Sequence, residues 1–171
     1  MTVMGRLRLL LWLLPASSAI AAGATPPKDA AVGKLLRALR PVPELRRQQN
    51  IGAVLREFKA QGLIPFRPSM RIDYTDYYPV QKSVLLFGHD LVVLEEEYMT
   101  KYVGCCVSEG GGALVRLKGA INELEAFAKA NLCSVREYES LEKYQKESHV
   151  SFALPPGRYA ELSCRARDED K

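Results

Sequence analysis

The chain has 171 residues, of which 47% are hydrophobic, and a net charge of +4 at pH 7. The length suits one domain, and the apolar fraction is typical of a globular protein and excludes a wholly disordered chain. Residues 1–59 carry ten Lys and Arg against three acidic residues, whereas residues 60–171 carry fourteen against seventeen. Because the basic excess lies in the N-terminal part, we do not expect a nucleic-acid-binding face on the main domain.

Residues 1–25 have the composition of a signal peptide. Arg6 and Arg8 precede an apolar run at residues 9–14, Pro15 ends this run, and mostly small residues follow. A basic start, a short apolar centre and a small-residue cleavage zone are the three parts of a secretory leader. The apolar run is too short to span a bilayer, which takes about 20 residues. We therefore expect a cleaved leader, after which any membrane contact is peripheral.

Residues 26–43 are interpreted as a basic segment that is either transit-like or disordered. They contain four basic residues and one acidic residue, with leucines spaced as in a short amphipathic helix. A transit segment behind a signal peptide is typical of proteins that enter plastids surrounded by extra membranes. Without a second cleavage, the protein would be secreted or lumenal and would begin with a loose basic helix. A mitochondrial presequence is the third alternative.

A single domain is expected from residue 44 to 166, followed by a charged tail at residues 167–171. Within this domain, residues 44–61 predict the clearest helix, because apolar residues recur at intervals of three and four. Gly62 suits the end of this helix. Residues 120–132 predict a second helix by the same spacing.

The remaining elements are predicted as strands. Residues 134–144 allow either a strand or a helix that begins at an S-x-x-E capping box. Hairpins are expected at residues 84–94, 102–117 and 150–166, where apolar or alternating runs flank turns rich in Gly and Pro. The glycines at 110–112 are assigned to the loop of the second hairpin. The predicted fold is α+β, with a single antiparallel sheet of four to six strands and helices packed on one face.

The chain carries no catalytic signature. It has no C-x-x-C pair, phosphate-binding loop, dinucleotide fingerprint or nucleophile elbow. His89 and Asp90 are explained by a hairpin turn, and the acidic run at 95–97 by a solvated strand edge. No catalytic residue, metal site or cofactor is predicted, and the protein is not expected to be an enzyme.

Cysteines occur at positions 105, 106, 133 and 164. Strand alternation assigns Cys105 and Cys164 to the core and Cys106 to a more polar face. Three interpretations stay open: four small buried side chains, structural disulfides with three alternative pairings, or a reactive Cys106 that is a thiolate or a redox partner of Cys133.

A group of tyrosines and arginines is the best candidate for a partner-binding surface, since these residue types dominate interface hot spots. The alternative is that the rings cap the sheet and keep their hydroxyl groups in water. The candidate partner-binding residues are Arg67, Arg71, Tyr74, Tyr77, Tyr78, Tyr98 and Tyr102.

These observations favour a non-enzymatic accessory subunit or assembly factor of an organellar membrane protein complex, for example in the plastid thylakoid. Its partner would be a protein of that complex, and it would act by docking. One alternative is a secreted or lumenal thiol/disulfide protein that works through Cys106. Another is a small-ligand-binding α+β domain that uses an uncovered face of its sheet.

Overall fold

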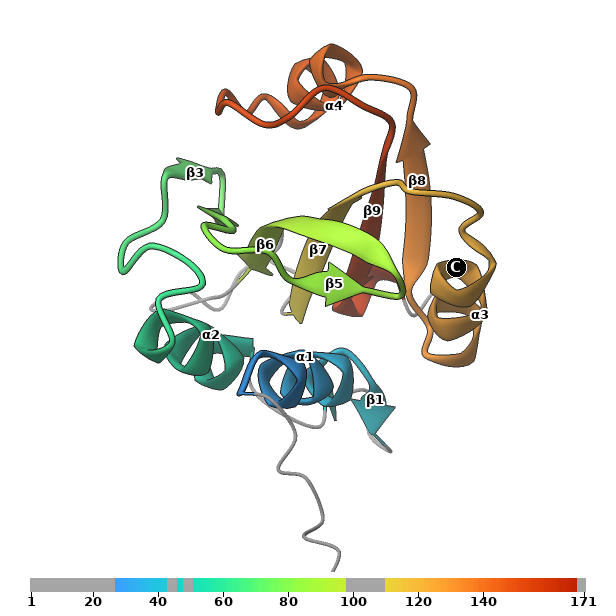
Figure 1. Ribbon diagram of the computed structural model, residues 1–171. Helices are drawn as coiled ribbons and strands as arrows, with labels where there is room; N and C mark the ends of the chain where they lie inside the picture. The colour runs from blue at the N-terminus through green and yellow to red at the C-terminus, as the bar shows by residue number, and fades with distance from the viewer. Residues whose placement is uncertain (1–26, 43–45, 48–50, 98–109, 169–171) are drawn as a thin grey trace, which may run out of the picture.

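The computed structural model describes residues 27–42, 46–47, 51–97 and 110–168, so the expected leader at 1–25 lies outside the described residues. Helices cover both faces of one antiparallel sheet (Figure 1). In chain order the elements are α1 (Pro27–Ala38), β1 (Pro41–Val42), β2 (Arg46–Arg47), α2 (Ile51–Ala60), β3 (Met70–Ile72), β4 (Thr75–Pro79), β5 (Leu85–Leu86), β6 (His89–Glu97), β7 (Gly110–Arg116), α3 (Asn122–Ala130), β8 (Ser134–Tyr138), α4 (Leu141–Ser148), β9 (Tyr159–Arg165) and the 3-10 helix η1 (Ala166–Asp168).

The sheet has seven strands in the order β3-β4-β6-β7-β9-β8, with β5 paired to β6. All of these pairs are antiparallel. The α+β class with a single antiparallel sheet is therefore confirmed, with more strands than the four to six expected. A separate two-stranded sheet joins β1 to β2.

Three helices lie on one face of the sheet, which we call the α1–α3 face, and α4 lies on the other, the α4 face (Figure 1). The expectation of helices on one face is wrong for α4, because β4, β6, β7 and β9 carry apolar side chains on both faces. The core of the α1–α3 face includes Leu35, Leu39, Val54, Leu55, Phe58, Leu94, Val115, Leu124 and Leu162. The core of the α4 face includes Tyr77, Val93, Leu114, Tyr138, Tyr144 and Tyr159.

The N-terminal segment belongs to the domain. Residues 27–38, expected to be transit-like or disordered, form α1, and Ala31, Leu35 and Leu39 are buried in the core. Lys34 pairs with Glu57 of α2 at 2.9 Å. The segment is thus not disordered: its leucines belong to a helix packed in the core, so the folded domain begins before residue 44.

The helix expected at 44–61 begins at Ile51 in the described part of the chain, because residues 46–47 form β2. Its predicted apolar stripe is buried, which confirms the spacing argument. Gly62 has a φ of 60°, the left-handed conformation that glycine adopts readily at a helix end. None of the helices in the described ranges has both the length and the hydropathy that crossing a membrane requires.

The first predicted hairpin is present as β5 and β6. Its turn is formed by Phe87 and Gly88, which both have positive φ, as a type I′ two-residue hairpin turn requires. His89 is therefore not a turn residue but the buried first residue of β6, where its Nδ1 accepts a hydrogen bond from the backbone N–H of Lys118.

The loop that was expected in the second predicted hairpin is wrong. The strand expected at 102–107 lies outside the described residues, and Gly110–Gly112 form the start of β7 instead of a flexible loop. A Cβ at Gly111 would lie 2.8 Å from Cγ1 of Ile51 on α2 and 2.9 Å from the carbonyl oxygen of Glu95. The absence of a side chain at this position lets α2 approach the sheet closely.

The third predicted hairpin is wrong, because β9 pairs with β7 and β8 and residues 150–158 are irregular. Of the two alternatives for residues 134–144, the strand is present as β8, and the helix does not begin at the predicted capping box: α4 begins at Leu141 with Ser140 as its N-cap. The tail expected from residue 167 begins inside η1, where Asp168 is buried, and residues 169–171 lie outside the described part.

Candidate functional site

Strand β4 separates the two adjacent tyrosines of the predicted partner-binding group. Tyr77 and Tyr78 point to opposite faces of the sheet, and both are buried. This corrects their assignment to a surface, because both faces of β4 are covered by other elements. Tyr98 and Tyr102 lie outside the described residues.

The other members of the group are exposed. Arg67 lies in the loop between α2 and β3, Arg71 lies on β3, and Tyr74, in the turn between β3 and β4, is 50% exposed. Sequence reasoning missed Phe66, which is 82% exposed and has the largest exposed fraction among the large hydrophobic side chains of the described ranges. A single aromatic residue between two prolines gives no periodic signal that could have identified it.

Lys59 links Phe66 to the buried ring of Tyr78. The Nζ of Lys59 lies 5.9 Å from the ring centroid of Phe66 and 4.5 Å from that of Tyr78, and it donates a hydrogen bond of 3.5 Å to the Tyr78 hydroxyl. A cation between two rings is attracted to both π faces. The side chain of Lys59 is therefore oriented by aromatic contacts beside Phe66.

Arg71 extends this arrangement along β3. Its guanidinium forms a two-point ion pair with the buried carboxylate of Asp76, at 2.5 and 2.7 Å. The Tyr78 hydroxyl lies 3.4 Å from the same carboxylate. Contacts thus run without interruption from Phe66 through Lys59, Tyr78 and Asp76 to Arg71. We name Lys59, Phe66, Arg67, Arg71 and Tyr74 the aromatic-basic surface.

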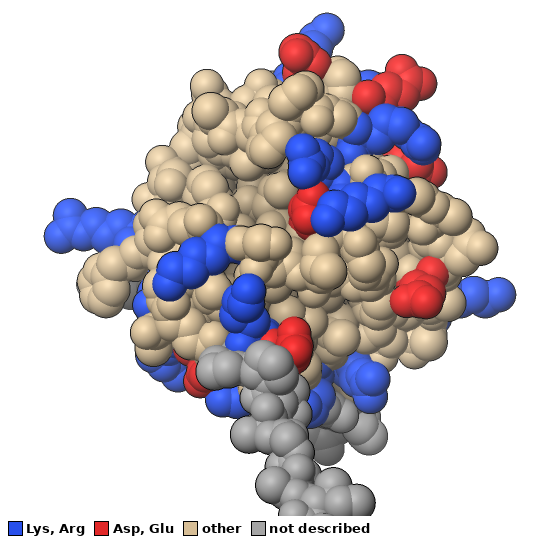
Figure 2. Space-filling model, in the orientation of Figure 1, with Lys and Arg blue, Asp and Glu red and all other residues tan. Residues whose placement is uncertain are grey.

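The charges at this surface are mixed but mainly positive. Glu96 lies on the same face of the sheet as Asp76, and burial, with the nearby Asp76 charge, raises the pKa of Glu96. The positive charges of Lys59, Arg56 and Arg71 lower the pKa of Glu96 and so oppose this rise. Lys and Arg side chains also project over the loop that follows α2, at the left of the molecule (Figure 2).

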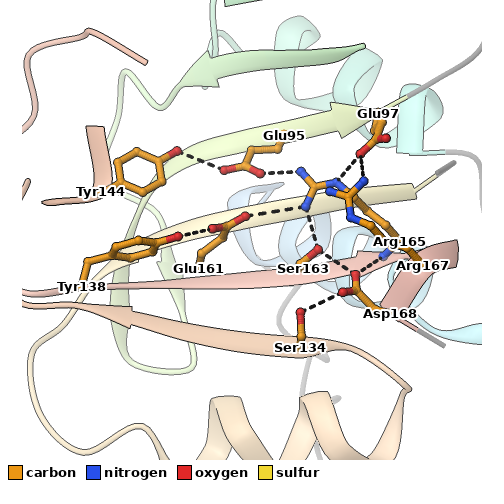
Figure 3. A network of polar contacts seen from close by, with 10 residues as sticks. All are labelled: Glu95, Glu97, Ser134, Tyr138, Tyr144, Glu161, Ser163, Arg165, Arg167 and Asp168. Atoms are coloured by element: carbon orange, nitrogen blue, oxygen red, sulfur yellow. Dashed lines mark hydrogen bonds and ion pairs between the residues drawn. The ribbon is translucent and has the colours of Figure 1, made fainter. Parts of the chain in front are cut away.

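A second polar arrangement is buried on the α4 face, centred on Arg165 of β9 (Figure 3). The side chain of Arg165 is 3% exposed and lies 2.6 Å from Glu95, 3.0 Å from Glu97 and 3.6 Å from Glu161. We call these four residues the buried carboxylate cluster. Three carboxylates therefore surround one desolvated guanidinium.

Further groups complete the cluster (Figure 3). The Tyr144 hydroxyl donates to Glu95 at 3.1 Å, the Tyr138 hydroxyl donates to Glu161 at 2.7 Å, and Arg167 pairs with Glu97 at 2.6 Å. Burial, strengthened by the nearby Glu161 charge, raises the pKa of Glu95 to about 7, although Arg165 and Tyr144 lower it.

Asp168 fixes the position of Arg165 from η1. It accepts hydrogen bonds from the backbone N–H of Arg165 and from the hydroxyl groups of Ser163 and Ser134, at 2.7 to 2.9 Å. Burial alone would raise the pKa of Asp168, but these three donors lower it below its usual value. The guanidinium of Arg165 also donates to the hydroxyl group of Ser163.

The interpretation of residues 95–97 as a solvated edge is wrong for Glu95 and Glu97, which are buried. Strand alternation places these two on the opposite face from Glu96, but Arg165, which pairs with both, is 70 positions from Glu95 on a strand that is not hydrogen-bonded to β6. In the sequence, the one signal for this cluster was the polar face formed by residues 161, 163 and 165.

The structure pairs Cys133 with Cys164 in a disulfide, with Cα atoms 4.4 Å apart. Cys133 is therefore not the partner of Cys106, which lies outside the described residues. Cys164 is buried among the core residues of the α1–α3 face, as alternation predicts. The disulfide joins the residue before the edge strand β8 to the neighbouring strand β9.

Two surface hollows flank Arg158. One, of about 610 Å³, is lined by residues 117–122, Glu137 and Arg158. The other, of about 430 Å³, includes residues 139–142 and 156–158 in its lining. Neither lies on an open sheet face, which is where the ligand-binding alternative expects a site. The described ranges contain no group of His, Cys, Asp and Glu that could hold a metal ion.

Comparisons of the chain with protein-family models, curated proteins and solved structures find no match. Its function must therefore be argued from the residues themselves.

Proposed function

We propose that the protein is a non-enzymatic accessory subunit or assembly factor that docks onto a protein partner through the aromatic-basic surface. The observation that carries this proposal is Phe66, whose large apolar ring is 82% exposed beside the ammonium group of Lys59. Burying such a ring is favourable by about 1.5–3 kcal/mol. Aromatic and Arg side chains are the residue types enriched in interface hot spots.

The charges favour a partner segment that combines an apolar anchor with carboxylates. Lys59 lies 5.9 Å from the Phe66 ring and Arg67 follows Phe66 in the chain, whereas the charges of Arg71 and Asp76 balance each other in their two-point contact. An apolar side chain of the partner would cover the Phe66 ring while acidic side chains meet Lys59 and Arg67. Such complementarity increases the association rate and the specificity of docking.

The proposed compartment is an extracytoplasmic lumen, in a complex at a membrane. The leader-like composition of residues 1–25 and a disulfide that would persist in an oxidising compartment both support this. A second cleavage within 27–43 would remove a core helix, so we favour a single cleavage before α1 over the plastid route.

Replacement of Phe66 tests the docking proposal. In cells that express the full tagged chain, the wild-type protein is expected to migrate within a larger complex on native gels of detergent-solubilised membranes. Phe66→Asp is expected to shift it to the position of the free protein. In a binding assay with the partner so identified, Phe66→Ala should weaken affinity about 30-fold, equivalent to the 2 kcal/mol of a hot spot.

Leu132→Asp is the matched control. Leu132 is another exposed apolar residue, 47% accessible, and its φ of 52° suits Asp better than most residues. This variant should stay in the complex. A wild-type protein that migrates alone would contradict the accessory-subunit proposal, and a Phe66→Asp variant that keeps the complex would contradict the assignment of the surface.

A further inference from the structure

The buried carboxylate cluster has more negative than positive charge. Glu95, Glu97 and Glu161 carry three carboxylates, whereas the guanidinium of Arg165 is the one positive group buried with them in the described structure. Arg167 adds a second positive charge, but its side chain is 50% exposed. Two guanidinium groups cannot neutralise three ionised carboxylates, and an uncompensated buried charge is costly.

The groups that face Glu95 come from every element around it. They are Tyr77 of β4, Glu97 of β6, Glu161 and Arg165 of β9, Tyr138 of β8, Tyr144 of α4, and Arg167 and Asp168 of η1. Burial raises the pKa of Tyr144 far above its usual value, so its hydroxyl keeps its proton and remains a donor to Glu95. Gly112, on the neighbouring strand, contributes no side chain.

The geometry distinguishes the three carboxylates. Glu97 lies between two guanidinium groups, 3.0 Å from that of Arg165 and 2.6 Å from that of Arg167. Glu161 is partly solvated, with 19% of its side chain exposed. Glu95 is 1% exposed, and within the described residues its one cationic partner is Arg165, which it shares with the other two carboxylates. Desolvation therefore disfavours the ionised form most strongly at Glu95.

We propose that the buried carboxylate cluster is a proton-binding site built into the fold, which takes up one proton at Glu95 in the neutral pH range. Proton uptake at Glu95 lowers the excess negative charge of the cluster while Arg165 keeps its contacts with Glu97 and Ser163. The folded state should therefore become more stable, relative to the unfolded state, as the pH falls through this range. This inference is independent of the docking surface, which lies on the opposite face of the sheet.

The sign of this pH dependence of stability follows from proton linkage. Burial raises the pKa of Glu95 from 4.5 to about 7, so between these values the folded state binds more protons than the unfolded state. The stabilisation is fully present below pH 4.5 and is lost as the pH rises to about 7. Groups with lowered pKa values, such as Asp90 and Asp168, make stability change with pH in the opposite sense, so the effect must be isolated by a variant.

The direct test is a carboxyl-carbon NMR titration of the wild-type protein with labelled glutamate. The Glu95 signal is assigned by its loss in Glu95→Gln, and its midpoint is expected near pH 7. If Glu95→Gln does not fold, Tyr144→Phe provides the assignment, because removal of the donor hydroxyl should move the Glu95 midpoint to higher pH. A Glu95 midpoint below pH 5 would overturn the proposal.

Urea unfolding between pH 5 and 8 supplies the second measurement. The unfolding constant of the wild type, divided by that of Glu95→Gln, should rise on the order of 100-fold over this range. Glu123→Gln, on the exposed face of α3, is the control and should track the wild type. A constant ratio between the wild type and Glu95→Gln would also overturn the proposal.

Discussion

At the scale of single residues, the buried ion pair between Glu95 and Arg165 depends on a glycine. Glu95 and Arg165 meet across β7, over Gly112, which pairs with Glu95 on β6 and with Ser163 on β9. A Cβ at Gly112 would lie 2.9 Å from Oε2 of Glu95, 3.0 Å from the carbonyl oxygen of Leu162 and 3.4 Å from a guanidinium nitrogen of Arg165. Gly112 therefore provides the space in which the two charged groups meet.

Gly112→Ala should destabilise the protein, because the new methyl group would overlap both the Glu95 carboxylate and a backbone carbonyl. Overpacking of this kind costs about 1–3 kcal/mol, which urea unfolding can measure. Gly119→Ala is the control, since a Cβ at Gly119 meets no atom within 4 Å and should change stability by less than about 0.5 kcal/mol. Equal effects at the two positions would show that Gly112 is not required for the ion pair.

At the scale of elements, α1 decides where the domain begins. Its buried stripe packs on α2, and Lys34 pairs with Glu57 across the two helices. A basic amphipathic helix has the same sequence pattern whether it binds an import receptor or its own core. A helix that packs in its own core needs a complementary apolar surface in the same chain, and α2 and the sheet provide it.

Leu35→Ala tests whether α1 is part of the folded unit. Leu35 is fully buried, so its truncation should lower the free energy of unfolding by about 2–5 kcal/mol. Arg37→Ala, on the exposed side of α1, should have little effect. Both can be measured by urea unfolding of the chain without residues 1–25. No loss of stability in Leu35→Ala would mean that α1 is not docked in solution.

At the scale of the whole molecule, the disulfide joins β8, the edge strand of the sheet, to its neighbour β9. Cys133 and Cys164 are 31 positions apart in sequence. Ser134 and Arg165, the residues that follow them, both donate hydrogen bonds to Asp168. The covalent bond and the polar contacts therefore hold the same edge of the sheet together.

Removal of the disulfide should reduce stability by about 3–4 kcal/mol, the loop-closure value for this separation. The double variant Cys133→Ser, Cys164→Ala can be compared with the wild type by urea unfolding, with and without a dithiol reductant. The reductant should destabilise the wild type alone. If the two proteins unfold at the same urea concentration without reductant, the disulfide has no stabilising role.

The sequence alone determined the elements whose signal is local. The apolar stripe of α2, the helix α3, the hairpin of β5 and β6 and the α+β class all follow from periodicity and turn residues within short windows. Each pattern lies within one element, or within two elements joined by a short turn, so no knowledge of the rest of the chain is needed to read it.

Only the tertiary structure decided which elements meet. Arg165 pairs with Glu95 because two strands far apart in sequence lie on either side of β7, and Cys133 pairs with Cys164 because β8 joins the edge beside β9. The same packing buries Tyr77 and Tyr78 and leaves Phe66 exposed. Burial and charge pairing are properties of neighbours in space, and strand order, which sets those neighbours, leaves no periodic trace in the sequence.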